Sequence, residues 1–233
     1  MPHHLPTLAA IDTSTELASV AVLHLGELFT QQSSGASTHS ATVLPMLQRA
    51  LHEAGIELAD CEAFAYGCGP GSFTGVRTAC GLVQGLAFGL QRKVVPVVTL
   101  LAMAEAARMA GAGDELIAVM DARMGEVYSA RYRYDGEWHT LSEPTLSRAE
   151  QVELDAEIAV CGNGVLAYPE AFAAYAAERR YPEILPHAAS IVRLAVAALA
   201  NGEGVDARDA QPLYLRNKVA LTTAERLAAG VAS

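Results

Sequence analysis

A glycine-rich string, CGPGSFTGVRTACGLVQGLAFGL from Cys68 to Leu90, is the first place in this sequence where residue types and spacing could do chemistry. A P-loop wraps phosphates with glycines and with a lysine before its final Ser or Thr, yet Arg77 is the only base in the string. Gly69, Gly71 and Gly75 follow the spacing G-x-G-x-x-x-G, which is one residue longer than the dinucleotide-binding motif. The string therefore matches neither phosphate-binding motif.

The serine of the string is not placed for nucleophilic catalysis either. A nucleophile elbow has the pattern G-x-S-x-G, and Pro70 stands where Ser72 would need a preceding glycine. A structural role remains, because glycines let a buried strand turn sharply, and Ser72 or Thr74 can cap the first free N–H groups of a helix. The start of the string predicts a tight turn into a helix.

Within that helix, Gly81, Gly85 and Gly89 recur every four residues and therefore lie along one ridge. Each interior glycine costs about 1 kcal/mol relative to alanine, so the three together cost roughly 3 kcal/mol. Close contact with another backbone is the usual compensation. That backbone could belong to the same lobe or to another subunit.

The preceding helix, predicted from about Ser40 to Ala54, is apolar over an unusually wide arc. Its apolar side chains span about 160° on a helical wheel, where a half-buried helix needs a stripe only somewhat above 100°. They are Val43, Leu44, Met46, Leu47, Ala50, Leu51 and Ala54. The excess favours burial on two sides, against the sheet and against a partner, and so an association surface built from both helices.

Two stretches of the chain repeat one pattern, LAAIDTSTELASVAVLHLGELFTQQ and LIAVMDARMGEVYSARYRYDGEWHTL. Each begins with an apolar run that ends in an aspartate, Asp12 or Asp121, and continues through a turn, a strand, a hairpin turn and another strand. With the helix and strand that follow, two copies of β-β-β-α-β-α predict a duplicated α/β fold of ribonuclease H-like lobes, the plan of the actin and sugar-kinase superfamily. The stretch GAGD interrupts the helical periodicity, which predicts an N-terminal lobe over residues 1–110 and a smaller C-terminal lobe with a tail over residues 111–233.

The turn DTST, from Asp12 to Thr15, lies where nucleotide binds in that superfamily. Active kinases and ATPases of this plan usually carry glycine there, so that backbone N–H groups face the phosphates, and this turn has none. ATP hydrolysis is therefore not expected, and a turn capped by Asp and Thr is the default. A metal site is not expected either, because two ligands on one helical face need H-x-x-x-H spacing, and His39 is followed four residues later by Val43.

Composition narrows the classes of function. The 233 residues are 52% hydrophobic and 18% charged, which is typical of a folded globular protein. The formal net charge is −10 and basic residues form only short pairs, so autonomous binding of nucleic acid is disfavoured. The cysteines form no C-x-x-C pair, and no signal peptide is recognised. Pro96, Glu105 and Arg108 interrupt the apolar stretch from Val94 to Ala112. This stretch therefore predicts a strand and a helix, not a membrane span. A cytoplasmic location is expected.

Five stretches together resemble the TsaB (YeaZ) family, glycoprotease-like bacterial proteins of tRNA threonylcarbamoyladenosine biosynthesis. They are LAAIDTSTELASVAVL, STHSATVLPML, GCGPGSFTGVRTACGLVQGLA, MDARMGEVYSARY and PLYLRNKVA. The resemblance runs from about Leu8 to Ala220, and the pairing of GPGSFTGVR with DARMGEVY is its most specific part. Tyr214 and Arg216 belong to the last stretch and have no assigned role.

The resemblance implies a scaffold subunit and not a catalyst. In that family the protein pairs through its N-terminal lobe with the related TsaD, which transfers threonylcarbamoyl to the tRNA adenosine next to the anticodon. The ATPase TsaE joins the pair, and the protein forms a homodimer when TsaD is absent. The implied partner contacts are Leu44, Leu47, Leu51, Thr78, Gly81, Leu82, Gly85 and Phe88.

The same resemblance implies what the chain would bind besides its partners. Asp12, Thr13 and Ser14 become a vestigial nucleotide turn, no cofactor is required, and ATP or ADP could bind at the interface with TsaD. The chain would reach tRNA only through the complex. Two enzymatic alternatives stay open: a glycoprotease-like peptidase that acts on its paralogue, and a weak actin-like ATPase or kinase.

Overall fold

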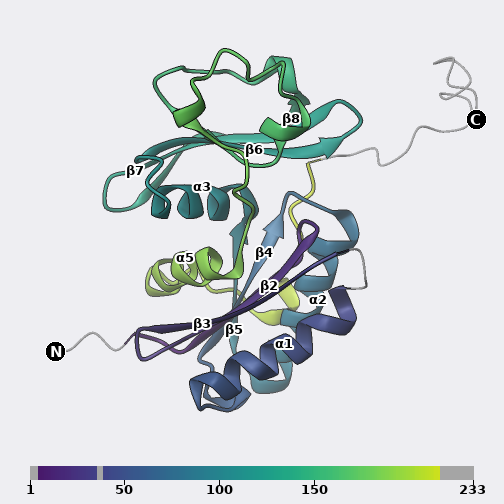
Figure 1. Cartoon of the computed structure of the whole chain (residues 1–233). Coiled ribbons are helices and arrows are strands. Elements are labelled where there is room, and N and C mark those ends of the chain that lie inside the picture. The colour runs from purple at the N-terminus through teal and green to yellow at the C-terminus, as the bar shows by residue number, and fades with distance from the viewer. Residues whose placement is uncertain (1–4, 36–38, 216–233) are drawn as a thin grey trace, which may run out of the picture.

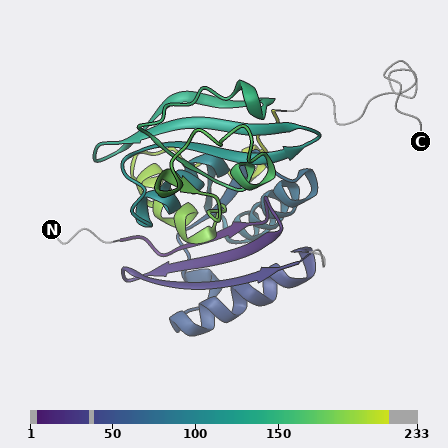
Figure 2. The ribbon, with the colours of Figure 1, turned by 45° about the horizontal axis from the view of Figure 1, so that its top comes forward.

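The chain folds into two α/β lobes that stack on each other (Figure 1; Figure 2). The computed structural model describes residues 5–35 and 39–215. Each lobe contains a five-stranded sheet, and both sheets have the order 3-2-1-4-5 when strands are numbered within the lobe. In each, the first three strands pair antiparallel and the last two run parallel to the first. The predicted duplicated, ribonuclease H-like α/β fold is confirmed.

The first sheet lies in the N-terminal lobe. Its strands are β1 (Leu8–Asp12), β2 (Leu17–His24), β3 (Glu27–Ser34), β4 (Ala63–Gly69) and β5 (Lys93–Val98). Every residue of β1 and β4 is buried, as expected of strands that helices cover on both faces. Because β1 and β4 are parallel neighbours, their carboxyl ends bring the DTST turn and the start of the glycine-rich string to one edge of the sheet.

Helices cover both faces of the first sheet. On one face lie α1 (His39–Ala54) and α2 (Phe73–Leu90), which share a core with the sheet through residues such as Val83. On the opposite face lies α5 (Ala188–Ala200), packed through residues such as Ile191. Figure 2 shows α1 on the side of the first sheet that faces away from the second lobe.

The second sheet repeats the arrangement with shorter final strands. Its strands are β6 (Glu115–Arg123), β7 (Glu126–Tyr134), β8 (Trp138–Arg148), β9 (Ala159–Cys161) and β10 (Arg180–Tyr181). One face is covered by α3 (Thr99–Met109), which also contacts α5 between the two sheets. The other face is covered by the segment that carries α4 (Gly164–Ala167). Short 3-10 helices occur at η1 (Leu58–Asp60), η2 (Ala149–Gln151), η3 (Ala177–Arg179) and η4 (Ala207–Asp209).

The predicted division at residue 111 separates the two sheets but not the two lobes. After the second sheet, α5 returns to the first lobe, and the chain stays there as far as Leu213: Val205 bridges Val94, and the Tyr66 hydroxyl donates to the Gln211 carbonyl oxygen at 2.9 Å. The apolar surface of the first sheet causes this return, because α5 buries a face that would otherwise contact water.

The apolar stretch from Val94 to Ala112 forms most of β5 and all of α3, as predicted. Among the described residues, no helix combines the length and the apolar character that a membrane crossing requires.

Candidate functional site

The start of the glycine-rich string is a tight turn that packs on the DTST turn. The backbone N–H of Ser72 donates to the Ser14 carbonyl oxygen at 2.7 Å, and the Thr13 hydroxyl donates to the Gly75 carbonyl oxygen at 2.6 Å. A Cβ atom at Gly75 would overlap the Thr13 carbonyl oxygen. The Ser72 side chain accepts from the Gly75 N–H and caps α2. The predicted turn and its Ser72 cap are confirmed. Glycine is required at position 75 because its backbone contacts the backbone of Thr13.

Asp12 lies beneath this turn and is fully buried. Its Oδ2 accepts from the Ser14 hydroxyl at 3.0 Å, whereas its Oδ1 has no hydrogen-bond partner among the described residues. Burial raises the pKa of Asp12 to about 7, although the hydrogen bonds from Ser14 act in the opposite direction. A Cβ atom at Gly67 would overlap Oδ1, so the glycine makes room for this carboxylate.

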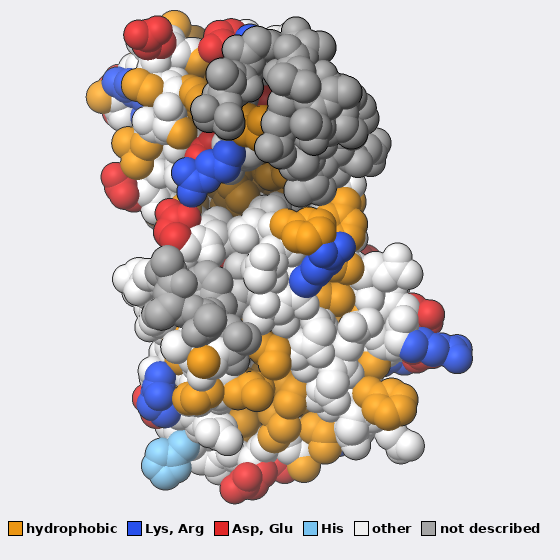
Figure 3. Space-filling view, turned by 90° about the vertical axis from the view of Figure 1, so that its right-hand side faces the viewer, with side chains coloured by type: hydrophobic (Ala, Val, Ile, Leu, Met, Phe, Trp, Pro, Cys, Tyr) orange, Lys and Arg blue, Asp and Glu red, His pale blue; other side chains and the backbone are white. Residues whose placement is uncertain are grey.

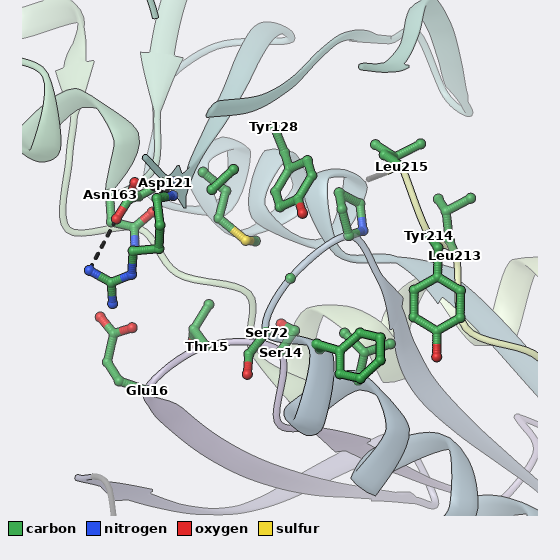
Figure 4. Close-up of a pocket in the computed structure, with 17 residues that line it drawn as sticks. Ser14, Thr15, Glu16, Ser72, Asp121, Tyr128, Asn163, Leu213, Tyr214 and Leu215 are labelled. Carbon is green, nitrogen blue, oxygen red and sulfur yellow. Dashed lines mark hydrogen bonds and ion pairs between the residues drawn. The ribbon is translucent and has the colours of Figure 1, made fainter. Parts of the chain in front are cut away.

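A cleft of about 480 Å³ separates the lobes above the turn. Asp121 and Asn163 lie at one end and Tyr214 at the other, with Ser14 and Thr15 on the side of the first lobe (Figure 4). The described residues that line it are Ser14, Thr15, Glu16, Pro70, Gly71, Ser72, Phe73, Val76, Met120, Asp121, Ala122, Arg123, Tyr128, Asn163, Leu213, Tyr214 and Leu215.

The lining contains only part of the predicted vestigial nucleotide turn, whose binding of nucleotide stays a prediction. Ser14 reaches the cleft, but Asp12 and Thr13 do not, because the loop between β4 and α2 packs over them. The lining offers two carboxylates, on Glu16 and Asp121, and a single cation, on Arg123. That cation pairs with Asp121 at 3.3 Å. The described lining residues therefore provide no surplus of positive charge, which would favour binding of a polyphosphate.

The Asp121 carboxylate is held by groups of its own lobe. Its Oδ1 accepts from the Arg123 backbone N–H at 2.8 Å and from the Tyr168 hydroxyl at 3.0 Å, and the Asp121 N–H donates to Asn163 at 3.0 Å. Burial and the hydrogen bond to Asp121 raise the pKa of Tyr168. Within residues 5–35 and 39–215, no group of three or more His, Cys, Asp or Glu side chains is arranged to hold a metal ion.

The second candidate site is the outer surface of the first lobe, which we call the α1–α2 face. It consists of the exposed or half-buried residues Leu44, Thr78, Gly81, Leu82, Gly85 and Phe88. Phe88 is 78% exposed and Leu44 is 38% exposed. Figure 3 shows hydrophobic side chains gathered over α1 and α2 on this side of the molecule.

The glycine ridge of α2 lies on the α1–α2 face and contacts no other described element. Gly81, Gly85 and Gly89 are exposed, and a Cβ atom added at any of them would meet no described atom within 4 Å. This excludes the alternative in which the ridge packs inside its own lobe, as far as the described residues go. Beside the face, a groove of about 730 Å³ runs between α1, Leu86 and the turn after α1.

Two of the predicted contact residues have another role. Leu47 and Leu51 are only 2% and 6% exposed, because they lie on the side of α1 that packs on the first sheet. They stabilise the lobe itself, and both also line the groove beside the α1–α2 face. The other six residues of that set are more accessible, and contact of all eight with a partner stays a prediction.

The sequence analysis missed a cluster where the α1–α2 face meets the cleft. The Arg77 guanidinium carbon lies 3.5 Å from the centre of the Phe73 ring, and Arg77 Nε donates to the Tyr214 hydroxyl at 2.6 Å. The available signal was the spacing, because Phe73 and Arg77 continue the four-residue series of the glycines toward the helix N-terminus. Arg216 lies outside the described residues.

Comparisons with known proteins agree with this fold. Residues 31–223 match the family model described as TsaD: tRNA N6-adenosine threonylcarbamoyltransferase. The chain is 38% identical to the tRNA threonylcarbamoyladenosine biosynthesis protein TsaB of Escherichia coli (strain K12), over 91% of this chain and 96% of that protein. It is 37% identical to the TsaB protein of Haemophilus influenzae, over 91% of this chain and 94% of that protein. The chain belongs to the TsaB family.

A solved structure extends the TsaB comparison to three dimensions. YeaZ from Pseudomonas aeruginosa is 40% identical to this chain and superposes with a TM-score of 0.84. The match covers 90% of this chain and 100% of the YeaZ chain. A second structure from that organism, with similarity to peptidase YEAZ, has a TM-score of 0.85. The TsaB family is one of tRNA threonylcarbamoyladenosine biosynthesis, so the expectation of a part in tRNA modification is confirmed at that level.

Proposed function

We propose that this chain is a non-catalytic scaffold subunit of the tRNA threonylcarbamoyl transfer machinery, which docks TsaD through the α1–α2 face and recruits TsaE. The observation that carries the proposal is the glycine ridge. Three interior glycines cost α2 roughly 3 kcal/mol relative to alanine, and nothing within the described chain uses the space they leave. A helix of a second protein could approach closely there and offset that cost.

The surroundings of the ridge support a protein partner. Phe88 and Leu44 flank the glycines with exposed apolar surface, and an accessible groove continues past Leu86. Exposed apolar patches of this kind mark interaction sites. The match to a TsaD family model shows that this fold is shared with the transferase, so TsaD is the partner we propose. A homodimer through the same face would form when TsaD is absent.

The remaining parts of the proposal follow from the site geometry. The buried Asp12 and the single, paired cation among the described lining residues of the cleft favour a chain that needs no cofactor of its own. ATP or ADP would then bind only at the interface with TsaD, and tRNA would be reached only through the complex in the cytoplasm. A net charge of −10 agrees with indirect contact to tRNA.

Sedimentation velocity on the chain alone and mixed with TsaD from the same organism tests the proposal. We expect a species at the mass of the heterodimer, formed while homodimer disappears, because both would use one face. If both proteins sediment unchanged at micromolar concentration, the scaffold role is wrong. Cleavage of TsaD by the purified chain would then favour the peptidase, and magnesium-dependent ATP turnover above a blank would favour the kinase.

Gly85→Leu tests where docking occurs. The added side chain projects into open space in the isolated chain, so the variant should fold normally and lose heterodimer formation by at least about 10-fold in affinity. Ala197→Leu is the matched control, because Ala197 is exposed on α5, which covers the opposite face of the first sheet. Normal docking by Gly85→Leu would refute the placement on α2.

A further inference from the structure

The cluster at the start of α2 holds an arginine in one orientation. The Arg77 guanidinium stacks on the Phe73 ring at 3.5 Å and lies 5.2 Å from the centre of the Tyr214 ring. The two rings are themselves 5.7 Å apart. Nε is occupied by the hydrogen bond to the Tyr214 hydroxyl. The stacking and this bond fix the plane of the guanidinium, and its two terminal nitrogens form no hydrogen bond with a described residue.

No described residue forms an ion pair with this guanidinium, which lies exposed on the surface. The chain is strongly acidic, with 26 acidic residues against 16 basic ones. An exposed arginine in such a chain easily finds a carboxylate, and others do, such as Arg123 with Asp121 at 3.3 Å. No described residue therefore occupies the free edge of Arg77, which leaves it accessible to an anion from a partner protein.

Phe73, Arg77, Gly81, Gly85 and Gly89 form one series at intervals of four residues along α2. Residues at this spacing lie in one row along a helix surface. The row has an aromatic–arginine pair at one end and three glycines after it. A partner helix seated along the glycines would pass directly over the Arg77 edge.

We infer that Arg77 is the polar anchor of the α1–α2 face and binds a carboxylate of the partner protein in a bidentate pair, oriented by Phe73 and Tyr214. This inference rests on the proposed function and adds to it the residue that selects the partner. Arginine suits the task because its planar fork matches a carboxylate with two parallel hydrogen bonds. Tyrosine and arginine are also enriched at the residues that dominate binding energy in interfaces.

The observations favour a carboxylate over an RNA phosphate. Affinity for a nucleic acid backbone grows with the number of phosphates that are neutralised, and the described members of this cluster supply one cation, Arg77. The row of glycines beside it leaves space in which a partner helix could pack, and it carries no charge that could bind a phosphate. An RNA contact is treated below as an outcome that overturns the inference.

Isothermal titration of TsaD from the same organism into the full chain tests the inference. Arg77→Ala should weaken binding at least about 10-fold. Arg77→Lys should recover little of that affinity, because an ammonium group does not stack on an aromatic ring and does not form two parallel hydrogen bonds with a carboxylate. Tyr214→Phe removes only the hydrogen bond to Nε and should weaken binding by about 2-fold to 5-fold. Arg193→Ala, an exposed arginine on α5, is the control and should bind within about 2-fold of the wild type.

A charge swap identifies the anion. Arg77→Glu should abolish detectable binding, and Lys substituted for one acidic residue of TsaD should restore it, while the same Lys variant weakens the wild-type pair. Circular dichroism of each variant checks that it is folded, and Arg77→Gln replaces any variant that is not.

Each other result overturns a distinct statement. If the wild type does not bind TsaD at all, the proposed function and the inference both fail. If the wild type binds and Arg77→Ala binds within about 2-fold of it, the inference alone fails. If Arg77→Ala keeps TsaD but the assembled complex loses tRNA, the anion is a phosphate and the carboxylate pair is wrong.

Discussion

Asp12 and Asp121 each lie near the end of the first strand of a lobe, so the two carboxylates can be compared directly. Asp12 is completely buried, and its Oδ1 has no partner among the described residues. The Asp121 side chain is 12% exposed, lines the cleft between the lobes, and accepts hydrogen bonds from Arg123 and Tyr168. The two copies of one strand order therefore present the same residue in opposite surroundings.

The loop after the fourth strand of each lobe causes the difference. In the first lobe this loop runs from Gly69 through Ser72 into the long α2, and its backbone bonds the DTST turn and covers Asp12. In the second lobe β9 leads into the four-residue α4, and Asn163 accepts from the Asp121 N–H without covering its carboxylate. The shared strand order therefore places the two first strands alike, and the loops after β4 and β9 determine which of the two carboxylates is accessible to a ligand.

The strongest test of this comparison is the pH dependence of stability. Between its ordinary value of 3.8 and about 7, the raised pKa of Asp12 keeps a proton on the folded chain that the unfolded chain has lost. The free energy of unfolding therefore falls as pH rises through this window, by about 1.4 kcal/mol per pH unit. Asp12→Asn lacks this dependence, and urea unfolding should show it gaining about 2 kcal/mol on the wild type between pH 5 and pH 7. Parallel curves for the two proteins would contradict the buried, unpartnered carboxylate.

A second test concerns the backbone contact that covers Asp12. Gly75→Ala should destabilise the chain by about 1–3 kcal/mol, because its Cβ would displace the Thr13 carbonyl. Gly81→Ala, two turns along the same helix, faces open space and should stabilise by about 1 kcal/mol. Chemical denaturation of both variants measures the two signs. Equal changes in the free energy of unfolding for the two variants would mean that the Thr13 carbonyl does not contact Gly75 closely.

The smallest effect is expected at Asp121, the carboxylate that lines the cleft. Asp121→Asn removes the ion pair with the 82% exposed Arg123, and such surface pairs contribute about 0–1 kcal/mol. We expect a loss of under about 1 kcal/mol in urea unfolding. A loss of several kcal/mol in the free energy of unfolding would show that Asp121 contributes to the stability of its lobe far more than a surface ion pair does. The contrast between the two carboxylates would then disappear.

Much of this molecule was predictable from local patterns. The apolar runs that end in Asp12 and Asp121, each followed by hairpin signals, predicted both sheets, and the glycines before Ser72 predicted the turn and its cap. These features depend on neighbours in the chain, on strand alternation and on free N–H groups at a helix end. The four-residue spacing of the ridge likewise predicted that its glycines share one side of α2.

Which surfaces remain exposed depended on contacts between distant segments. The helical wheel of α1 could not tell that Leu47 and Leu51 face the sheet while Leu44 faces solvent, because that depends on the angle at which the helix packs. The return of α5 to the first lobe, which overrides a division at residue 111, depends on which sheet face was left uncovered. Tyr214 reaches Arg77 across 137 residues of chain, a separation at which no local pattern acts.

The sequence by itself determined the duplicated α/β plan, the family and the glycine ridge, since each is written in short-range spacing and composition. Only the tertiary structure decided that Asp12 is fully buried, that Asp121 lines the cleft, and that Arg77 at the end of the ridge has no ion pair with any described residue. The physical reason is that burial and pairing are properties of surfaces brought together by folding, and a residue's neighbours in the chain do not specify them.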